Sequence, residues 1–403
     1  MFLLSLLRFF AGLVSLLILA AAIYLLASWY AGDWISAGDG RLVRERDDWR
    51  LWAGLGLMAW SCFGWFLAPL LVGTRDEQAP STAAVEGREL PQAGGIFVES
   101  HGPQGAPTIL FTHGWGMDAR FWDWARAGLS DRFRLEFWDL PGLGRSRRAE
   151  GSARSLEAMA VALAGVIEAA AGRRVVLVGH SIGGMVIQTL MRLHPELADR
   201  VAGAVLLHTT FANPLRTMLF GRLWLPLQKP LLEPAERLTI ALSPLVWAWK
   251  WQSWLSGSTH LAMRAGFGRK APRRALSLTA LLVTKAMPAT EARGNLAMMN
   301  WSGGDAVRNA RFPVLVVGGD VDIVTKAEAS RALASQSPLA RLDVRTGANH
   351  MGPVEDPKAY NALIADFTLA VQDAAAADGG RRRAIPRPRA EAGAPSETRP
   401  TVP

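Results

Sequence analysis

The strongest constraint on the fold of this chain is a serine between two glycines, placed where a strand-like run meets a helix-like segment. The apolar residues 175–178 lead into Gly179, Ser181 and Gly183, and the helix-like residues 185–193 follow. Because glycine has no Cβ, the flanking positions allow a turn tight enough to lift the serine oxygen above a sheet. An ordinary strand-to-helix turn has the same short pattern, so partners elsewhere must decide whether Ser181 is a nucleophile.

Such partners follow Ser181 at the ends of two later strand-like runs. Asp320 and Asp322 come after the apolar residues 314–317, and His350 comes after the run 342–345. A hydroxyl is a poor nucleophile at neutral pH, so it needs an imidazole to take its proton and a carboxylate to orient that imidazole. The order serine, acid, histidine is therefore one that suits nucleophilic catalysis.

Four motifs in order give the chain a resemblance to the α/β-hydrolase superfamily, over roughly residues 92–375. They are the glycine-rich turn at 113–116, the turn at 139–146, the elbow around Ser181, and residues 347–350 followed by 355–357. The resemblance implies an α/β fold, a mostly parallel sheet with helices on both faces and a helical cap inserted after the strand at 201–207.

The same resemblance implies a role for each site residue. Ser181 is expected to be the nucleophile, His350 the general base and acid, and the backbone amides of Trp115 and Ile182 the oxyanion hole. The residues expected to support this site are His113, Gly114, Gly179 and Gly183.

The acid is assigned to Asp322 in preference to Asp320. Relatives often carry glycine, two residues, the aspartate and then proline four positions on; Gly319 and Asp322 fit, but Lys326 replaces the proline. Some relatives carry the acid just after the strand at 201–207 instead. In this chain the segment at that place, which begins with His208, contains no carboxylate.

The chemistry expected at Ser181 is acyl transfer to water. Epoxide hydrolases and haloalkane dehalogenases of this superfamily place aspartate at the elbow, and the epoxide enzymes also use cap tyrosines; residues 212–300 contain no tyrosine. Hydrolysis of an ester or a lipid is the favoured reaction. Acyl transfer, amide or thioester cleavage and carbon–carbon bond hydrolysis remain alternative reactions, and a non-catalytic binding or scaffold protein remains an alternative function. No cofactor or metal is expected, and His101, His194, His208 and His260 are interpreted as ordinary core or surface residues.

Two long uncharged runs at the amino end predict a membrane anchor over residues 1–75. Residues 9–30 and 51–73 are each long enough, as helices, to cross a hydrocarbon core. A signal peptide is the alternative for the first run and a buried core helix for the second. The polar loop between them carries four arginines, whereas Arg8 precedes the first run, so the side of the membrane stays open. The single cysteine, Cys62, lies inside the second run.

The remaining residues divide by composition. We expect a linker at 76–95, the hydrolase core at 96–211 and 301–374, a helical cap at 212–300 and a disordered basic tail at 375–403. The strands expected in the core are 96–100, 108–113, 133–139, 174–180, 201–207, 314–319 and 340–346. The expected helices lie near 117–130, 153–171, 183–194, 326–336 and 357–373.

The cap concentrates the positive charge of the chain. It holds 12 Lys or Arg against 3 Glu and no Asp, and it also holds five tryptophans. Such a mixture suits anionic lipid headgroups, so we hypothesise that the cap rests on a bilayer and admits an apolar acyl substrate; a buried cap core with a solvated basic face is the alternative. The expected partners are therefore an ester or lipid substrate and membrane lipids. Nucleic acid is not expected, because no nucleic-acid motif accompanies the charge.

Overall fold

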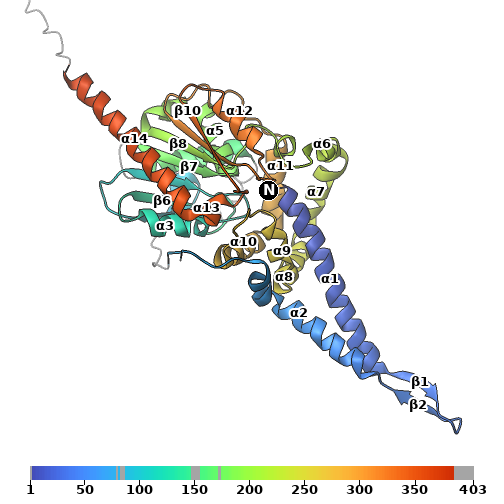
Figure 1. The fold of residues 1–403 in the computed structure, drawn as a ribbon. Helices are drawn as coiled ribbons and strands as arrows, with labels where there is room; N and C mark the ends of the chain where they lie inside the picture. Colours follow the sequence, from blue (N-terminus) through green and yellow to red (C-terminus); the bar gives the residue numbers. More distant parts are fainter. Residues whose placement is uncertain (1, 79, 82–86, 147–154, 171–173, 385–403) are drawn as a thin grey trace, which may run out of the picture.

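A computed structural model describes residues 2–78, 80–81, 87–146, 155–170 and 174–384. Its main feature is an eight-stranded sheet in the order β10-β9-β8-β7-β5-β6-β4-β3 (Figure 1). The strands of this sheet are β3 (Gly87–Leu90), β4 (Ile96–His101), β5 (Thr108–Thr112), β6 (Arg134–Trp138), β7 (Val175–His180), β8 (Val201–Leu207), β9 (Val314–Gly319) and β10 (Ala340–Arg345). Neighbours from β10 to β6 are parallel, and β4 and β3 are antiparallel to their neighbours.

The central strands are buried on both faces. Every residue of β5, β7, β8 and β9 is buried, as expected for parallel strands whose two faces are covered by helices. The helices of this core are α3 (Asp123–Leu129), α4 (Leu156–Ala169), α5 (Ile182–Leu193), α12 (Ala327–Ala334), α13 (Gly352–Glu355) and α14 (Pro357–Ala384). α14 packs on α3 and on β8, whereas α4 packs on α5, so helices cover the sheet from both sides (Figure 1). The predicted α/β fold with a mostly parallel sheet is confirmed.

Two predicted boundaries differ from the structure. The expected linker at 76–95 contains β3, which pairs antiparallel with β4 at the edge of the sheet. Backbone pairing makes this short polar segment a strand even though its side chains are mostly exposed. At the other end α14 runs to Ala384, past the expected end of the core at 374, and residues 385–403 of the expected tail lie outside the described residues.

The segment 212–300, which the structure describes throughout, folds into helices above the carboxyl ends of the strands. They are α6 (Gly221–Trp224), α7 (Glu233–Ala241), α8 (Ser243–Leu255), α9 (Ser258–Arg264), α10 (Arg273–Lys285) and α11 (Pro288–Met299). The structure has no strand of the sheet within this segment. Its position after β8 is the position expected for a cap.

Two long apolar helices precede the core. α1 (Phe2–Ala31) and α2 (Asp48–Val72) lie side by side and project away from the sheet, joined by the hairpin of β1 (Asp33–Ser36) and β2 (Leu42–Glu45) (Figure 1). Among the described residues they are the two helices whose length and hydropathy suffice to cross a membrane. Both begin earlier in the chain than the predicted runs, which started at residues 9 and 51.

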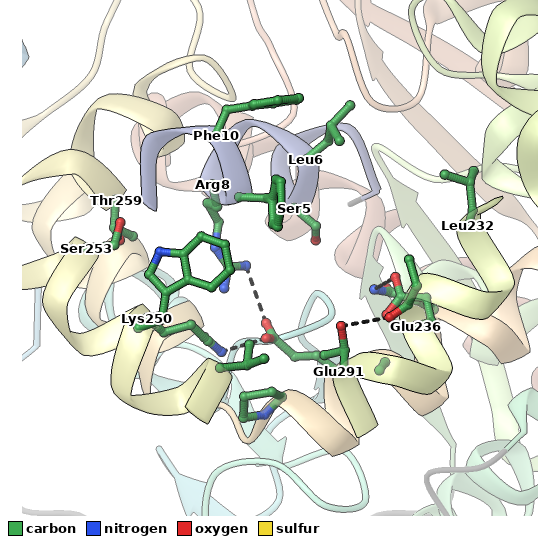
Figure 2. Close-up of a pocket in the computed structure, with 18 of the residues that line it drawn as sticks. Ser5, Leu6, Arg8, Phe10, Leu232, Glu236, Lys250, Ser253, Thr259 and Glu291 are labelled. Atoms are coloured by element: carbon green, nitrogen blue, oxygen red, sulfur yellow. Dashed lines mark hydrogen bonds and ion pairs between the residues drawn. The ribbon is translucent and has the colours of Figure 1, made fainter. Parts of the chain in front are cut away.

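The near ends of these helices are part of the cap. Leu4 is buried in the main hydrophobic core, and the first turns of α1 lie beside the cap helices (Figure 2). The ring of Trp249 packs against Phe9 with centroids 5.0 Å apart, and Trp254 stacks on Trp65 of α2 at the same separation. Two of the five cap tryptophans therefore hold the cap to α1 and α2.

Candidate active site

Ser181 occupies the sharp junction between β7 and α5. Its backbone angles, φ 55° and ψ −117°, lie in a region that a residue with a side chain rarely adopts. The two glycines around it have little space: a Cβ on Gly179 would lie 2.5 Å from the carbonyl carbon of Gly183, and a Cβ on Gly183 would lie 2.5 Å from the carbonyl oxygen of Thr112. The elbow therefore depends on glycine at both positions.

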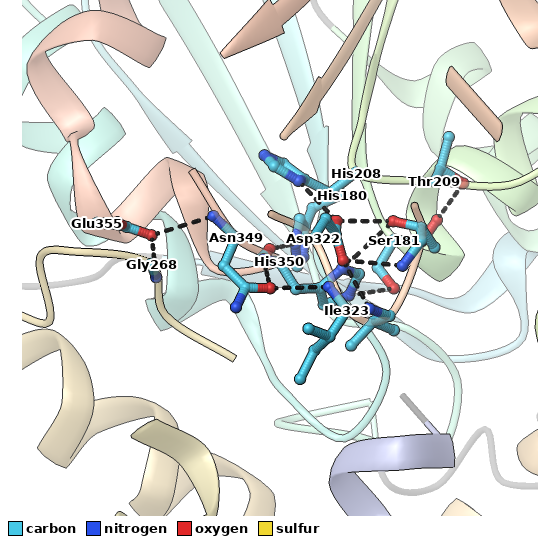
Figure 3. A network of polar contacts seen from close by, with 12 residues as sticks. His180, Ser181, His208, Thr209, Gly268, Asp322, Ile323, Asn349, His350 and Glu355 are labelled. Carbon is cyan, nitrogen blue, oxygen red and sulfur yellow. Dashed lines mark hydrogen bonds and ion pairs between the residues drawn. The ribbon is translucent and has the colours of Figure 1, made fainter. Parts of the chain in front are cut away.

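Three predicted residues meet in a hydrogen-bonded line at this elbow (Figure 3). The hydroxyl of Ser181 lies 3.0 Å from Nε2 of His350, and Nδ1 of the same ring lies 3.1 Å from Oδ2 of Asp322. All three side chains are buried. Because a carboxylate can only accept, the Nδ1 proton points to Asp322 and leaves Nε2 free to accept the proton of Ser181.

The structure separates the two candidate acids. Asp322 also accepts hydrogen bonds from the backbone amides of Val324 and Thr325, which fix the carboxylate. Asp320 instead accepts a hydrogen bond from the amide of Gly347 and makes no contact with His350. Of the two aspartates, Asp322 is therefore the one that contacts His350.

The protonation states of His350 and Asp322 allow His350 to act as a general base. Burial lowers the pKa of His350, although the Asp322 carboxylate opposes this effect. Burial raises the pKa of Asp322, but the imidazoles of His350 and His208 more than offset it, and the pKa lies well below its ordinary value. At neutral pH the pair therefore consists of a neutral imidazole and a carboxylate.

A second histidine contacts the same carboxylate. His208 donates from Nδ1 to Oδ2 of Asp322 at 2.9 Å, and its Nε2 accepts from the hydroxyl of Tyr360 at 2.6 Å. His208 has a φ of 47°, in the left-handed region. The interpretation of His208 as an ordinary core residue is therefore incomplete. The available signal was its place directly after β8, the other position at which relatives put the acid.

The elbow histidine has a separate structural role. His180 is fully buried, its ring stacks on Phe121, and its Nε2 lies 2.8 Å from the backbone oxygen of His350. Burial lowers its pKa well below the ordinary value, so the ring is neutral and donates this hydrogen bond. His180 thereby ties the loop of His350 to the elbow, a contact that the sequence pattern does not predict.

The loops of the acid and the histidine are also joined by one amide side chain. Oδ1 of Asn349 accepts from the backbone amides of Ile323 at 3.1 Å and of His350 at 2.8 Å (Figure 3). Its Nδ2 donates to the backbone oxygen of Ala265 in the cap region. Asn349 therefore fixes the separation between the two loops that carry Asp322 and His350.

The predicted oxyanion turn lies beside the elbow. A Cβ on Gly114 would lie 2.7 Å from the His180 ring, so the turn approaches β7 closely. His113 donates from Nδ1 to the oxygen of Gly114 at 2.8 Å and accepts the amide of Leu140 at Nε2, at 3.0 Å. Burial lowers the pKa of His113 to about 4, so it stays neutral while it holds the turn.

The two amides expected in the oxyanion hole sit at this turn and at the helix start. Ile182 is the first residue of α5, so its N–H has no partner within that helix. The side chain of Trp115 points away from the sheet: its indole donates to the backbone oxygen of Glu291 on α11 at 3.0 Å. The cap helix α11 thus fixes the residue whose amide is expected to bind the oxyanion.

His208, Asp322 and His350 also form a set whose ligand atoms lie within 4.8 Å of one another. The two imidazole Nδ1 atoms lie 2.9 and 3.1 Å from Oδ2 of Asp322, which are hydrogen-bond lengths. The three residues are therefore partners in a hydrogen-bonded network.

Comparison with known proteins shows the family of this chain. A family model described as "Alpha/beta hydrolase family" matches residues 109–363, which contain the elbow, the acid, the histidine and the cap. Among curated proteins, a pimeloyl-[acyl-carrier protein] methyl ester esterase from Yersinia enterocolitica is 26% identical over 272 residues, 66% of this chain and 94% of that protein. The matched family region begins after α1 and α2.

Two solved structures have the same fold. An esterase from Thermogutta terrifontis covers 72% of this chain and 99% of its own, with 23% identity and a TM-score of 0.56. The esterase RhEst1 from Rhodococcus sp. ECU1013 covers 72% and 100%, with 21% identity and a TM-score of 0.56. The chain therefore belongs to the alpha/beta hydrolase family, as an enzyme whose relatives and structural neighbours include esterases of the same fold.

Proposed function

We propose that this enzyme is a membrane-tethered serine hydrolase that cleaves an ester-linked acyl substrate through Ser181, His350 and Asp322. The observation that carries the proposal is the line of hydrogen bonds from Ser181 through His350 to Asp322, at 3.0 and 3.1 Å. This line starts at a strained elbow, at the carboxyl end of β7.

The mechanism follows from these contacts. As Ser181 Oγ bonds to the ester carbonyl carbon, its proton passes to His350 Nε2 and the carbonyl π electrons move to the oxygen. The amides of Trp115 and Ile182 stabilise that oxyanion. When the carbon–alkoxide bond breaks, His350 returns the proton to the leaving alcohol; water then attacks the acyl-enzyme with His350 again as base, releasing a carboxylic acid and Ser181.

Ester substrates are favoured over the other acyl chemistries by the comparisons. The Yersinia relative is a methyl ester esterase for an acyl chain on a carrier protein. An acyl-chain substrate also fits the apolar character of the cap, whose exposed side chains include Leu223, Leu231, Leu238 and Leu245.

In this proposal α1 and α2 are the helices that anchor the enzyme in the membrane. Their most apolar 18-residue stretches have mean hydropathies of 2.6 and 1.8, and large apolar side chains remain exposed along both helices. With every backbone N–H and C=O paired inside a helix, such segments are stable in a hydrocarbon core. The hairpin of β1 and β2 then lies on the opposite side of the membrane from the catalytic core and the start of α1.

The proposal is tested by ester hydrolysis with the full chain in phosphatidylcholine nanodiscs. On p-nitrophenyl esters from acetate to palmitate we expect hydrolysis that falls by about 10⁴-fold or more in Ser181→Ala. Ser335→Ala, which changes an exposed serine after α12, serves as the control and should match the natural sequence. Hydrolysis that survives in Ser181→Ala would refute the assignment of the nucleophile.

A further inference from the structure

A cavity of about 490 Å³ lies between the first turns of α1 and the cap helices α7, α8 and α11 (Figure 2). Its volume is typical of sites for small organic ligands, which span roughly 300–1,000 Å³. Its walls are largely carbon and include Leu6, Phe10, Leu232 and Trp249. Ser181 does not line it, so the cavity is distinct from the site of the proposed hydrolysis.

One helix separates this cavity from the oxyanion turn. The side chain of Glu291 on α11 lines the cavity, while the backbone oxygen of the same residue accepts the indole N–H of Trp115. Gly294, one turn further along α11, packs directly against the Trp115 ring. A ligand in the cavity would therefore contact the helix that holds Trp115 without touching Ser181.

Three charged side chains meet at one wall of the cavity. Arg8 from α1 lies 3.4 Å from Oε1 of Glu291, and Nζ of Lys250 from α8 lies 2.6 Å from Oε2 of the same carboxylate. All three line the cavity and keep 12–15% of their side-chain surface exposed. Two cations thus share a single, largely buried carboxylate.

The remaining ionisable lining residue does not balance this charge. Glu236 accepts a hydrogen bond from Asn295 Nδ2, and burial raises its pKa to about 7, so it is only partly ionised at neutral pH. Burial lowers the pKa of Lys250 to about 8, which leaves it mostly protonated. The wall formed by Arg8, Lys250 and Glu291 therefore carries excess positive charge, which is costly to bury without an anion.

We propose that the cavity binds an amphiphile with one carboxylate head group and a single acyl chain. The head group would lie at Arg8 and Lys250, where charge-assisted hydrogen bonds offset the surplus positive charge. The chain would lie along the apolar wall, where burial of its methylene groups stabilises the complex. A long-chain fatty acid anion has this chemistry.

The surroundings of the cavity give such a chain a route from an apolar phase. Phe10 and Leu231 both line the cavity and are 54% and 51% exposed, respectively, so its rim is apolar. In the membrane arrangement proposed above, this rim lies where α1 leaves the bilayer. A fatty acid could therefore come from the membrane or from an ester cleaved by the enzyme itself.

The test is equilibrium binding of radiolabelled palmitate to the full chain in phosphatidylcholine nanodiscs. We expect one palmitate per chain, and competition by unlabelled palmitate that is at least about tenfold stronger than by hexadecanol, which has the same chain without the charge. Arg8→Gln should weaken binding about tenfold or more, because it removes a cation that pairs with the head group. Arg237→Gln, a solvent-exposed arginine on α7, is the matched control and should bind normally.

A second variant acts on volume rather than charge. Ala235 lies on the exposed side of α7 and lines the cavity, so Ala235→Trp should occupy the space of the chain and lower palmitate binding about tenfold or more without a change in the core. Equal competition by palmitate and hexadecanol, or unchanged binding in both Arg8→Gln and Ala235→Trp, would overturn the proposal.

Binding to Ser181→Ala separates this inference from the proposed hydrolysis. Palmitate should bind this variant as tightly as it binds the natural sequence, because Ser181 does not line the cavity. Retained binding with added palmitate would show that the ligand need not be produced at Ser181. A loss of binding in Ser181→Ala would place palmitate at the elbow and contradict a separate site.

Discussion

At the scale of single residues, the arrangement at Ser181 is a chain of five side chains. Tyr360 donates to His208, His208 and His350 both donate to Asp322, and His350 accepts from Ser181. Ser181, Asp322 and His350 were predictable from the sequence, because each follows a strand whose carboxyl end lies at the same edge of the sheet. Tyr360 was not, since a lone tyrosine on a helix has no distinctive sequence pattern. For His208 the available signal was its place directly after β8, where some relatives carry the acid.

The first prediction concerns the pH dependence of activity. His350 must be neutral to accept the proton of Ser181, and burial lowers its pKa below the ordinary value of 6.5. We expect kcat/KM for an ester to rise with pH through a midpoint below 6.5 and to be level around neutrality. A pH–rate profile with a midpoint above 6.5 would contradict the neutral state assigned to His350.

The second prediction concerns His208 as a positioning residue. Its hydrogen bond draws on the carboxylate that stabilises the protonated ring of His350, and it therefore opposes protonation of that ring. In His208→Asn, chosen because asparagine tolerates a positive φ, we expect the acid limb of the kcat/KM profile to move to higher pH.

Tyr360→Phe is the companion variant for this prediction. It removes the hydroxyl that contacts His208 but leaves the hydrogen bond from His208 to Asp322 available. The acid limb should therefore move less than in His208→Asn. A profile for His208→Asn that falls in height but keeps its midpoint would assign His208 a purely structural role.

At the scale of elements, the strands were predictable and the edge of the sheet was not. The runs at 175–180, 201–207 and 314–319 are apolar throughout because these strands are buried on both faces. β3 is short, polar and mostly exposed, and it becomes a strand only because β4 offers an unpaired edge. Long-range pairing of this kind leaves no periodic signal in the sequence.

The third prediction tests the elbow between β7 and α5. A methyl group on Gly183 would lie 2.5 Å from the Thr112 carbonyl oxygen, and backbone atoms on both sides resist movement. We expect Gly183→Ala to lower the free energy of unfolding by about 1–3 kcal/mol and to lower kcat, because the elbow must open to accept it. Thermal unfolding and ester hydrolysis together measure both effects.

Gly38→Ala is the control for this variant. Gly38 lies in the loop between β1 and β2, has no atom within 4 Å of an added Cβ and does not have a positive φ. It should unfold and react as the natural sequence does. Equal stability of Gly183→Ala and Gly38→Ala would show that the elbow tolerates a side chain at that position.

At the scale of the whole molecule, α1 and α2 belong to the cap as well as to the proposed membrane anchor. Leu4 is in the core, Phe9 packs on Trp249, and Trp65 stacks on Trp254. The sequence predicts the two apolar runs, but their hydropathy says nothing of which end packs on the protein. Experiments on membrane binding are therefore best done with the full chain, because removal of residues 1–75 would uncover apolar cap surface.

The fourth prediction concerns membrane topology. If α1 and α2 both cross the bilayer, the β1–β2 hairpin and the catalytic core lie on opposite sides. With the exposed Cys62 replaced by serine, Asp39→Cys in the hairpin and Ser335→Cys in the core should react with a membrane-impermeant maleimide from opposite sides of sealed vesicles. Labelling of both positions from the same side would exclude two spans.

The central claim is that Ser181 is the nucleophile of a serine hydrolase. The most direct test is to treat the folded full chain with a fluorophosphonate and to locate the adduct by peptide mass spectrometry. We predict about one adduct per chain, on Ser181, which is absent in Ser181→Ala and strongly reduced in His350→Gln, because the serine oxygen then lacks its base. Absence of an adduct in folded protein, or an adduct that persists in Ser181→Ala, would contradict the claim.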